Sequence, residues 1–146
     1  MSESNVAQVI NENRGGWNEA MGLMFVVATK DEIVAELTIG PQHLQPYGIV
    51  HGGVYAGIIE TACSTGAALF ALANGSAVVG LENATSFLHA TRTGKLRVTA
   101  KPLTRGRRTQ VWEATVHNDD GKAAAAGRVR LLCLEPGSTL AGTRVD

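Results

Sequence analysis

One segment of this chain has helical periodicity, and no other feature constrains the fold as strongly. Between Val54 and Leu72 there is no proline and no strict alternation, and apolar residues recur at spacings of three and four. The pattern predicts one helix of about five turns that ends before Asn74-Gly75, because glycine commonly follows the last helical residue. A single helix cannot cover both faces of a large parallel sheet, so a Rossmann-like fold is excluded.

The segments around this helix alternate between apolar and polar residues, with the period of two that is typical of strands. The expected strands cover residues 21–28, 33–39, 77–87, 95–101, 111–116 and 128–134. We expect the first two to form a hairpin and the third to contain a bulge, and residues 118–121 (NDDG) are typical of a hairpin turn. This order predicts an α+β fold in which five or six antiparallel strands curl around one long central helix.

The length and composition of the chain fit one domain with a single packed core. It has 146 residues, of which 45% are hydrophobic and 18% are charged. We expect an N-terminal segment over residues 1–20, with a short helix within 5–13 that Gly15-Gly16 interrupts. The packed domain would span residues 21–135, and residues 136–146 are expected to form a disordered tail.

Charge, cysteine spacing and the first residues narrow the class of function. Thirteen basic residues balance thirteen acidic ones, but seven of the basic residues fall between Arg92 and Arg108. A local basic strip on a neutral protein favours a small anionic ligand over a nucleic acid. Cys63 and Cys133 lack metal-ligand spacing, so no metal is expected. No signal peptide or membrane span is recognised, which predicts a cytoplasmic protein without a membrane partner.

Three residues at the start of the helix, His51-Gly52-Gly53, form a candidate oxyanion site. The first amides of a helix have no partner within it, and the helix dipole places partial positive charge there. Glycine allows a ligand to approach the backbone closely. Such a site can stabilise a developing oxyanion without a charged side chain.

Glu60 is the only residue with a charged side chain between Glu36 and Glu82. A carboxylate in an otherwise uncharged helix is costly to bury, and Ser64, four residues later on the same face, could hydrogen-bond it. Taken alone, Glu60 is equally consistent with a residue that reaches solvent, and His-Gly-Gly with a tight turn. Their combination at this spacing favours an active site.

The run HGGVYAGIIETACS resembles the signature of hotdog-fold acyl-CoA thioesterases of the phenylacetate-degradation type and of the Arthrobacter-type 4-hydroxybenzoyl-CoA thioesterases. The resemblance extends from Met21 to Glu135. Gln45 together with Glu60 is the pairing of the Arthrobacter-type branch, to which this chain is most similar. Ser64 stands where that branch usually has threonine, so the hydroxyl group is retained.

This resemblance implies a hotdog fold and a role for each residue of the motif. The Gly52 amide, with help from Gly53, would polarise the thioester carbonyl, and Gln45 would orient the thioester or the attacking water. Glu60 would act either as a nucleophile that forms a mixed anhydride or as a general base on water. His51 would hold the loop around Gln45.

The resemblance also implies a homo-oligomer, either a dimer or a dimer of dimers, because the helices of two subunits pack together in such folds. Glu60 of one subunit would then face Gln45 and Gly52 of its neighbour, and the active sites would be shared. Coenzyme A would enter as part of the substrate, so no separate cofactor is expected.

Seven further residues are expected to bind the acyl-CoA: Arg105, Arg107, Arg108, Tyr55, Thr85, Ser86 and Phe87. The arginines lie in an expected hairpin connection, where they could bind phosphates or equally form a solvated turn. Residues 85–87 fall where relatives line the acyl end of the site, and Tyr55 could line an apolar pocket. An aryl, a short aliphatic and a long aliphatic acyl group all remain open.

Other functions on the same fold are weighed against hydrolysis. A non-catalytic acyl-CoA binding or sensing protein would keep the pocket but would not need a carboxylate at position 60. A hotdog dehydratase or hydratase would use a histidine at a loop apex, whereas His51 leads directly into the helix. A purely structural oligomer is the remaining alternative.

Overall fold

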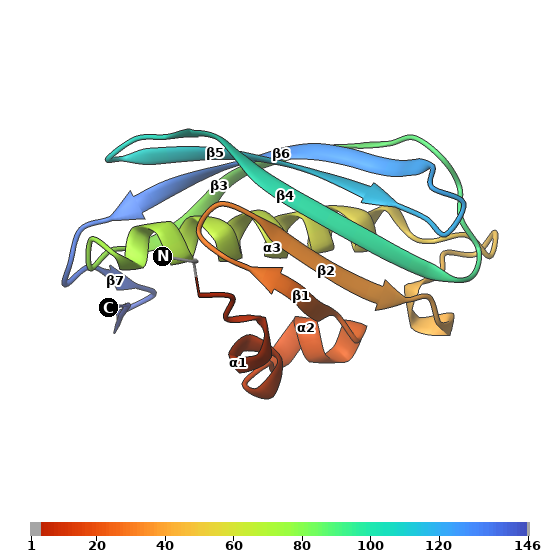
Figure 1. Ribbon diagram of the computed structural model, residues 1–146, viewed down its shortest axis with the longest axis horizontal. Helices are drawn as coiled ribbons and strands as arrows, with labels where there is room; N and C mark the ends of the chain where they lie inside the picture. The colour runs from red at the N-terminus through yellow and green to blue at the C-terminus, as the bar shows by residue number, and fades with distance from the viewer. Residues whose placement is uncertain (1–3, 146) are drawn as a thin grey trace.

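The computed structural model describes residues 4–145 and consists of one long helix partly enclosed by a curled sheet (Figure 1). The helices are α1 (Ala7–Glu12), α2 (Gly16–Met21) and α3 (Gly52–Leu72), with a 3-10 turn at Pro41–His43. The strands are β1 (Met24–Ala28), β2 (Ile33–Thr38), β3 (Ala77–Phe87), β4 (Lys95–Arg105), β5 (Thr109–His117), β6 (Ala123–Leu134), β7 (Thr139–Leu140) and β8 (Thr143–Arg144).

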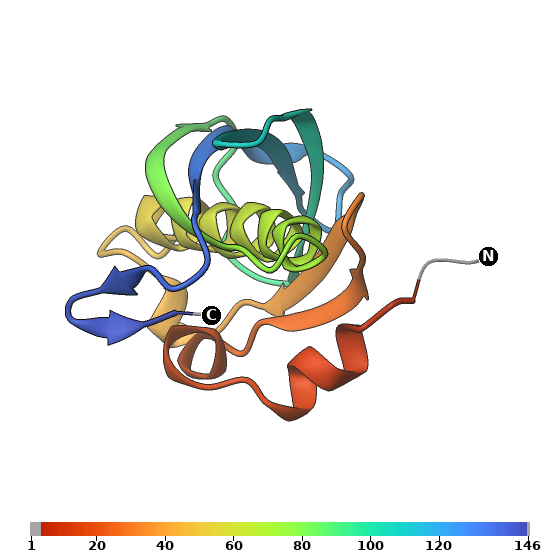
Figure 2. The ribbon, with the colours of Figure 1, turned by 90° about the vertical axis from the view of Figure 1, so that its left-hand side faces the viewer.

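The main sheet has six strands in the order β1-β2-β4-β5-β6-β3, and every neighbouring pair is antiparallel. Figure 2 shows α3 inside the curve of this sheet, with β3 at one margin and β1 at the other. The predicted α+β architecture, with one long helix and a six-stranded antiparallel sheet, is therefore confirmed. The predicted bulge is present as well, as a register shift between Gly80 and Glu82 of β3.

The core lies between α3 and the concave face of the sheet. Ile58 and Ile59 of α3 are fully buried, as is Trp112 of β5. A Cβ at Gly66 would lie 2.4 Å from the Trp112 ring, so this glycine lets the indole lie directly on the helix. The Trp112 indole N–H donates to Gln110 Oε1 (2.8 Å), and the Gln110 amide donates to the carbonyl of Ala67 (3.1 Å). The buried polar groups of Trp112 and Gln110 therefore all have hydrogen-bond partners where the sheet meets the helix.

The two margins of the sheet differ in how they are protected. Along β1, Asn11 exchanges two hydrogen bonds with the backbone of Phe25 (2.8 and 2.9 Å), and Asn5 bonds the backbone of Val26 and Ala28 (3.1 and 2.9 Å). These side chains cap the free edge that β1 would otherwise present. At the other margin β3 pairs only with β6, and Phe87 is 60% exposed. The β3 edge is thus the one open to a partner.

By length and composition alone α3 could cross a membrane, since its 21 residues have a mean hydropathy of 1.3 over the most apolar stretch. Half of that stretch is buried inside the molecule. Packing against the sheet therefore accounts for the apolar character of α3.

Two terminal segments differ from the sequence prediction. Residues 16–21 form α2, although the strand was expected to begin at Met21, and β1 starts only at Met24. The tail predicted to be disordered forms the β7–β8 hairpin, whose turn residues Ala141 and Gly142 both have positive φ (48° and 82°). Two residues with positive φ match the twist of a two-residue hairpin turn. The glycine at position 142 is the sequence signal for this turn, and the prediction of a disordered tail did not use it. Residues 1–3 and Asp146 of the two terminal predictions lie outside the described part of the chain.

Candidate active site

Glu60 lies in the middle of α3 on the side that faces β3, and it is half-buried. The Ser64 hydroxyl donates to Oε2 of Glu60 at 2.9 Å, as the i to i+4 spacing predicts. The Asn83 amide donates to Oε1 at 3.3 Å from β3. Both oxygens of the carboxylate therefore have a neutral donor, and no cation among residues 4–145 forms an ion pair with it.

Asn83 is a residue that sequence reasoning did not single out as a support for Glu60. Its amide also donates to the carbonyl of Ala56 (3.0 Å), and its Oδ1 accepts a hydrogen bond from the Thr85 hydroxyl (2.6 Å). The β3 bulge makes this possible, because the extra residue brings both Gly80 and Asn83 to the helix side. A Cβ at Gly80 would lie 2.9 Å from Glu60 Oε2, so glycine leaves room for the carboxylate there.

The N-terminus of α3 keeps one free backbone donor. His51 is the N-cap, and its Nδ1 accepts a hydrogen bond from the Gly53 amide at 2.7 Å. The Val54 amide donates to the His51 carbonyl (2.9 Å), whereas the Gly52 amide forms no hydrogen bond within residues 4–145. The Gly53 N–H is therefore committed to the cap, which contradicts its predicted part in the oxyanion site. Because Nδ1 accepts, a neutral His51 ring carries its proton on Nε2.

The loop that carries Gln45 is held mainly by His43, whereas His51 was predicted to hold it. His43, which is buried, accepts from the Gly40 amide (2.8 Å) and bonds the Met21 carbonyl through Nε2 (2.8 Å). Its own carbonyl accepts a hydrogen bond from the His51 amide (2.8 Å), which ties the helix start to this loop. Gln45 Oε1 accepts the Tyr47 amide, so the side-chain amide nitrogen of Gln45 remains the available donor.

A cavity of about 340 Å³ opens beside the Gly52 amide. Its lining residues are Gln45, Ile49, Val50, Gly52, Tyr55, Phe87, Leu88, His89 and Ala90. The Phe87 ring covers Gly52 so closely that a Cβ there would lie 2.7 Å from ring carbons. The predicted residues Gln45, Gly52, Tyr55 and Phe87 thus share one cavity. Thr85 instead supports Asn83, and Ser86 is exposed on β3.

Glu60 and the Gly52 amide are too far apart to act together within one chain. They are eight residues apart on one helix, which corresponds to about 12 Å along its axis. A reacting carbonyl must lie within about 3 Å of both its oxyanion donor and its nucleophile or water. Within a single chain the Gly52 amide and the Glu60 carboxylate therefore cannot act on the same carbonyl group.

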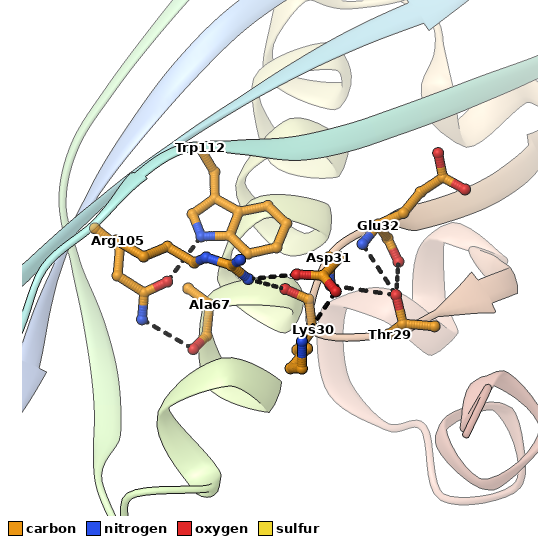
Figure 3. Close-up of polar contacts among 8 residues, drawn as sticks. Thr29, Lys30, Asp31, Glu32, Ala67, Arg105 and Trp112 are labelled. Carbon is orange, nitrogen blue, oxygen red and sulfur yellow. Dashed lines mark hydrogen bonds and ion pairs between the residues drawn. The ribbon is translucent and has the colours of Figure 1, made fainter. Parts of the chain in front are cut away.

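The three arginines at the turn between β4 and β5 have different surroundings. Arg105 forms a 2.7 Å ion pair with Asp31 and donates to the Lys30 carbonyl at 2.7 Å (Figure 3). Its guanidinium group also lies 4.3 Å from the centre of the Phe70 ring. Its guanidinium group is thus engaged within the chain, contrary to the predicted phosphate contact. Arg107 and Arg108 line a second cavity of about 870 Å³ near the end of α3, and neither has an acidic partner within residues 4–145.

Cys63, which lies on α3 three residues after Glu60, does not supply a nucleophile at this site. Burial raises the pKa of the Cys63 thiol far above its usual value, and the charges of Glu60 and Glu113 raise it further. The thiol is consequently protonated at neutral pH, and a protonated thiol is a poor nucleophile. Glu60 is left as the charged group of this part of the helix.

The part of the chain that holds these residues is similar in sequence to a known family and to individual known proteins. The sequence profile of the thioesterase superfamily matches residues 47–125, which include His51-Gly52-Gly53, Glu60 and all of β3. A Mycobacterium tuberculosis protein named as a candidate esterase is 41% identical over 123 residues, or 82% of this chain and 86% of that protein. The proofreading thioesterase EntH of Cronobacter sakazakii is 30% identical over 116 residues, or 80% of this chain and 84% of EntH.

Solved structures share the architecture. The M. tuberculosis protein superposes with a TM-score of 0.80 at 39% identity, covering 82% of this chain and 96% of that one. A thioesterase from Haemophilus influenzae superposes with a TM-score of 0.80 at 27% identity and covers 92% of both chains. These matches confirm the predicted hotdog fold.

Replacing His51 tests the cap of α3. We expect His51→Ala to lower the free energy of unfolding by about 1 kcal/mol, because the Gly53 amide loses its acceptor. His51→Asn, whose side chain can accept the same hydrogen bond, should retain most of the stability. Urea unfolding followed by circular dichroism measures both variants, and an alanine variant as stable as the natural protein would show that the cap contributes nothing.

Proposed function

Since this chain belongs to the thioesterase superfamily, we propose that it hydrolyses an acyl-coenzyme A thioester to the free acid and coenzyme A. The observation that carries the proposal is the Glu60 carboxylate, half-buried on an uncharged helix and oriented by Ser64 and Asn83. The two donors hold the carboxylate in one orientation, from which it could attack a carbonyl carbon or accept a proton. A protein that only binds acyl-CoA would not require that arrangement.

We further propose that the active site is shared between two copies of the chain, which join through the open β3 edge. Glu60 of one copy would face Gln45 and Gly52 of the other, which removes the separation of about 12 Å within each chain. The two-fold symmetry of such a contact creates two equivalent sites. The β1 edge is already capped by Asn5 and Asn11, which favours β3 as the contact. A dimer of dimers would preserve this unit.

The reaction would use a backbone hydrogen-bond donor on one side of the thioester and a carboxylate on the other. The Gly52 amide would donate to the carbonyl oxygen, where negative charge develops as the carbon becomes tetrahedral. Glu60 would either attack this carbon, with water later cleaving the mixed anhydride, or remove a proton from the attacking water. In both cases the C–S bond breaks and the thiolate of coenzyme A takes up a proton. On the general-base path the water oxygen enters the acid, and on the anhydride path water adds to one of the two anhydride carbonyls and releases Glu60 and the acid. Gln45 would orient the thioester or the water through its free side-chain nitrogen.

The phosphates of coenzyme A are assigned to Arg107 and Arg108. Both line the 870 Å³ cavity together with Phe70, which follows Glu60 by ten residues on α3. Ten helical residues span about 15 Å, a distance that the extended pantetheine arm can cover. Arginine suits this role because its planar group can bind phosphate through two parallel hydrogen bonds.

Two further assignments follow from the sequence. The combination of Gln45, Glu60 and the Ser64 hydroxyl supports placement in the Arthrobacter-type branch, with roles as described for that branch. A cytoplasmic location is the second of these proposals.

Replacing Glu60 tests the reaction directly. We expect Glu60→Gln to lower kcat by about 10²- to 10⁴-fold, because the amide can neither attack nor accept a proton. Thiol release from a panel of aryl, short-chain and long-chain acyl-CoA substrates measures turnover. Glu12→Gln is the matched control, since it removes an exposed carboxylate from α1, away from Glu60 and from β3.

Each outcome of this assay separates the candidate functions. Undiminished hydrolysis by Glu60→Gln would remove Glu60 from the mechanism. No turnover of any member by the natural protein, with acyl-CoA binding still detectable, would favour a binding or sensing protein. Hydration of an enoyl-CoA without thiol release would favour a hydratase.

Mixing two defective variants tests the shared site. A dimer of one Glu60→Gln copy and one Gln45→Ala copy would hold one intact site, because the intact Glu60 and Gln45 then come from different chains. We expect the co-expressed pair to show several-fold more activity than the sum of the separately prepared variants. Activity equal to that sum would indicate a site contained within one chain.

Replacing the arginines of the second cavity tests the phosphate site. Arg107→Ala and Arg108→Ala should each raise KM about tenfold with little change in kcat, the effect of losing one charged hydrogen bond made equally before and during reaction. Arg97→Ala is the control, because Arg97 pairs with Glu36 on the outer face of the sheet (3.5 Å). An unchanged KM in both cavity variants would show that the phosphates bind elsewhere.

A further inference from the structure

The indole ring of Trp17 lies directly on α3 at Gly57. A Cβ at Gly57 would lie 2.4 Å from a ring carbon of Trp17, so the contact depends on glycine at this position. Trp17 belongs to α2, and the next residue of that helix, Asn18, accepts a hydrogen bond from the Thr61 hydroxyl of α3 (3.1 Å). Trp17 is nevertheless 41% exposed. A large apolar ring therefore remains accessible beside α3, outside the stripe of helix residues that the sheet buries.

This ring is close to Glu60. Gly57 and Glu60 are three residues apart on α3, so they lie on the same side of the helix and are separated by about 4.5 Å along its axis. The Glu60 carboxylate is turned toward β3, where Asn83 bonds it. Trp17 contacts the helix about one turn before the carboxylate, in the direction of the helix N-terminus. A group that extends from Glu60 toward the start of α3 therefore reaches this ring within one helical turn.

The acyl group of the proposed substrate is directed toward Trp17. This step rests on the proposed function, in which the phosphates of coenzyme A bind at Arg107 and Arg108 near the end of α3. The pantetheine arm would then leave Glu60 toward the C-terminal end of the helix. The acyl group is attached on the opposite side of the thioester carbon, so it would extend the other way, toward Gly57.

The helix that carries Trp17 is anchored at several points. Asn18 is bonded to α3, and the carbonyl of Met21 accepts a hydrogen bond from Nε2 of the buried His43 (2.8 Å). Leu23, which follows the helix, is fully buried in the core. A segment with so many buried and bonded neighbours opens only at a large cost in free energy. The ring is therefore a fixed wall rather than a movable flap.

We propose that Trp17 is a specificity residue that closes the acyl end of the site, so that short acyl thioesters are hydrolysed and long straight-chain ones are excluded. A short acyl group fits between Glu60 and the ring and buries its apolar surface against the indole. A longer chain overlaps the ring, and forcing extra methylene groups into an occupied space is unfavourable. This wall decides between the short and long aliphatic substrates that the sequence motif leaves open.

A series of straight-chain acyl-CoA thioesters tests the proposal. The probes are butanoyl-, hexanoyl-, octanoyl- and dodecanoyl-CoA. We expect kcat/KM of the natural protein to fall from the short to the long members. Trp17→Ala should raise the ratio of kcat/KM for dodecanoyl-CoA to that for butanoyl-CoA by about tenfold or more, because each further methylene group that becomes buried contributes about fourfold. Trp17→Phe, with a smaller ring, should give an intermediate ratio.

Val9→Ala is the matched control. Val9 is 58% exposed on α1, in the same N-terminal segment, and α1 packs on β1, so the ratio should stay as in the natural protein. If the alanine variant at position 17 does not fold, Trp17→Phe carries the same test with a smaller shift.

Three results would overturn the proposal. The first is an unchanged ratio in the folded Trp17 variants. The second is a natural protein that hydrolyses dodecanoyl-CoA as well as butanoyl-CoA. The third is an equal loss of activity on every member of the series. Size-exclusion chromatography interprets this last result, because loss of the dimer in Trp17→Ala would assign the ring to a contact between two copies of the chain.

A binding measurement separates this inference from the proposed reaction. Calorimetric titration of Glu60→Gln, with and without Trp17→Ala, needs no turnover. If the natural protein hydrolyses nothing but long thioesters bind more weakly than short ones only while Trp17 is present, the proposed hydrolysis fails and the Trp17 inference stands. If all lengths are hydrolysed equally well, hydrolysis stands and the Trp17 inference fails. If no thioester binds, both fail.

Discussion

The apolar side of α3 packs against the concave face of the sheet, and the positions of the candidate site residues follow from this contact. Ile58 and Ile59 are fully buried there, and Gly66 allows Trp112 to lie directly on the helix. Gln110 satisfies the Trp112 indole and bonds the helix backbone at Ala67. With the helix fixed in rotation, Glu60 is directed toward β3.

The same contact divides the site and leaves an edge open. One helix carries both the Gly52 amide and Glu60, but its rise keeps them about 12 Å apart. The sheet that covers α3 ends at β3, which pairs only with β6. Its opposite margin is closed by asparagine side chains from the N-terminal segment. A second copy at β3 would therefore complete the proposed site and cover the exposed edge in one step.

The polar groups near the candidate site are of two kinds. Some are already paired within the chain, and others remain available to a ligand. Arg105 is engaged with Asp31 and Phe70, and the Gly53 amide with His51, so neither is available to a ligand. The Gly52 amide has no partner within residues 4–145. Glu60 has only neutral donors around it. A carboxylate and an unpaired backbone donor are what a reaction that forms an oxyanion requires.

The sequence alone determined the features that depend on spacing along the chain. The long helix, the six main strands, the β3 bulge and the Glu60–Ser64 contact all follow from periodicity or an i to i+4 interval. The helix α2 and the β7–β8 hairpin were not predicted from the sequence, because they are short and their apolar patterns are weak.

Only the tertiary structure decided which distant side chains meet. Asn83 reaches Glu60 because the bulge changes which residues of β3 face the helix, and Arg105 reaches Asp31 across two separate turns. Such contacts depend on strand register and packing, which no local spacing encodes. The sequence thus specified the elements and the motif, and the fold decided which of its polar groups remain available for chemistry.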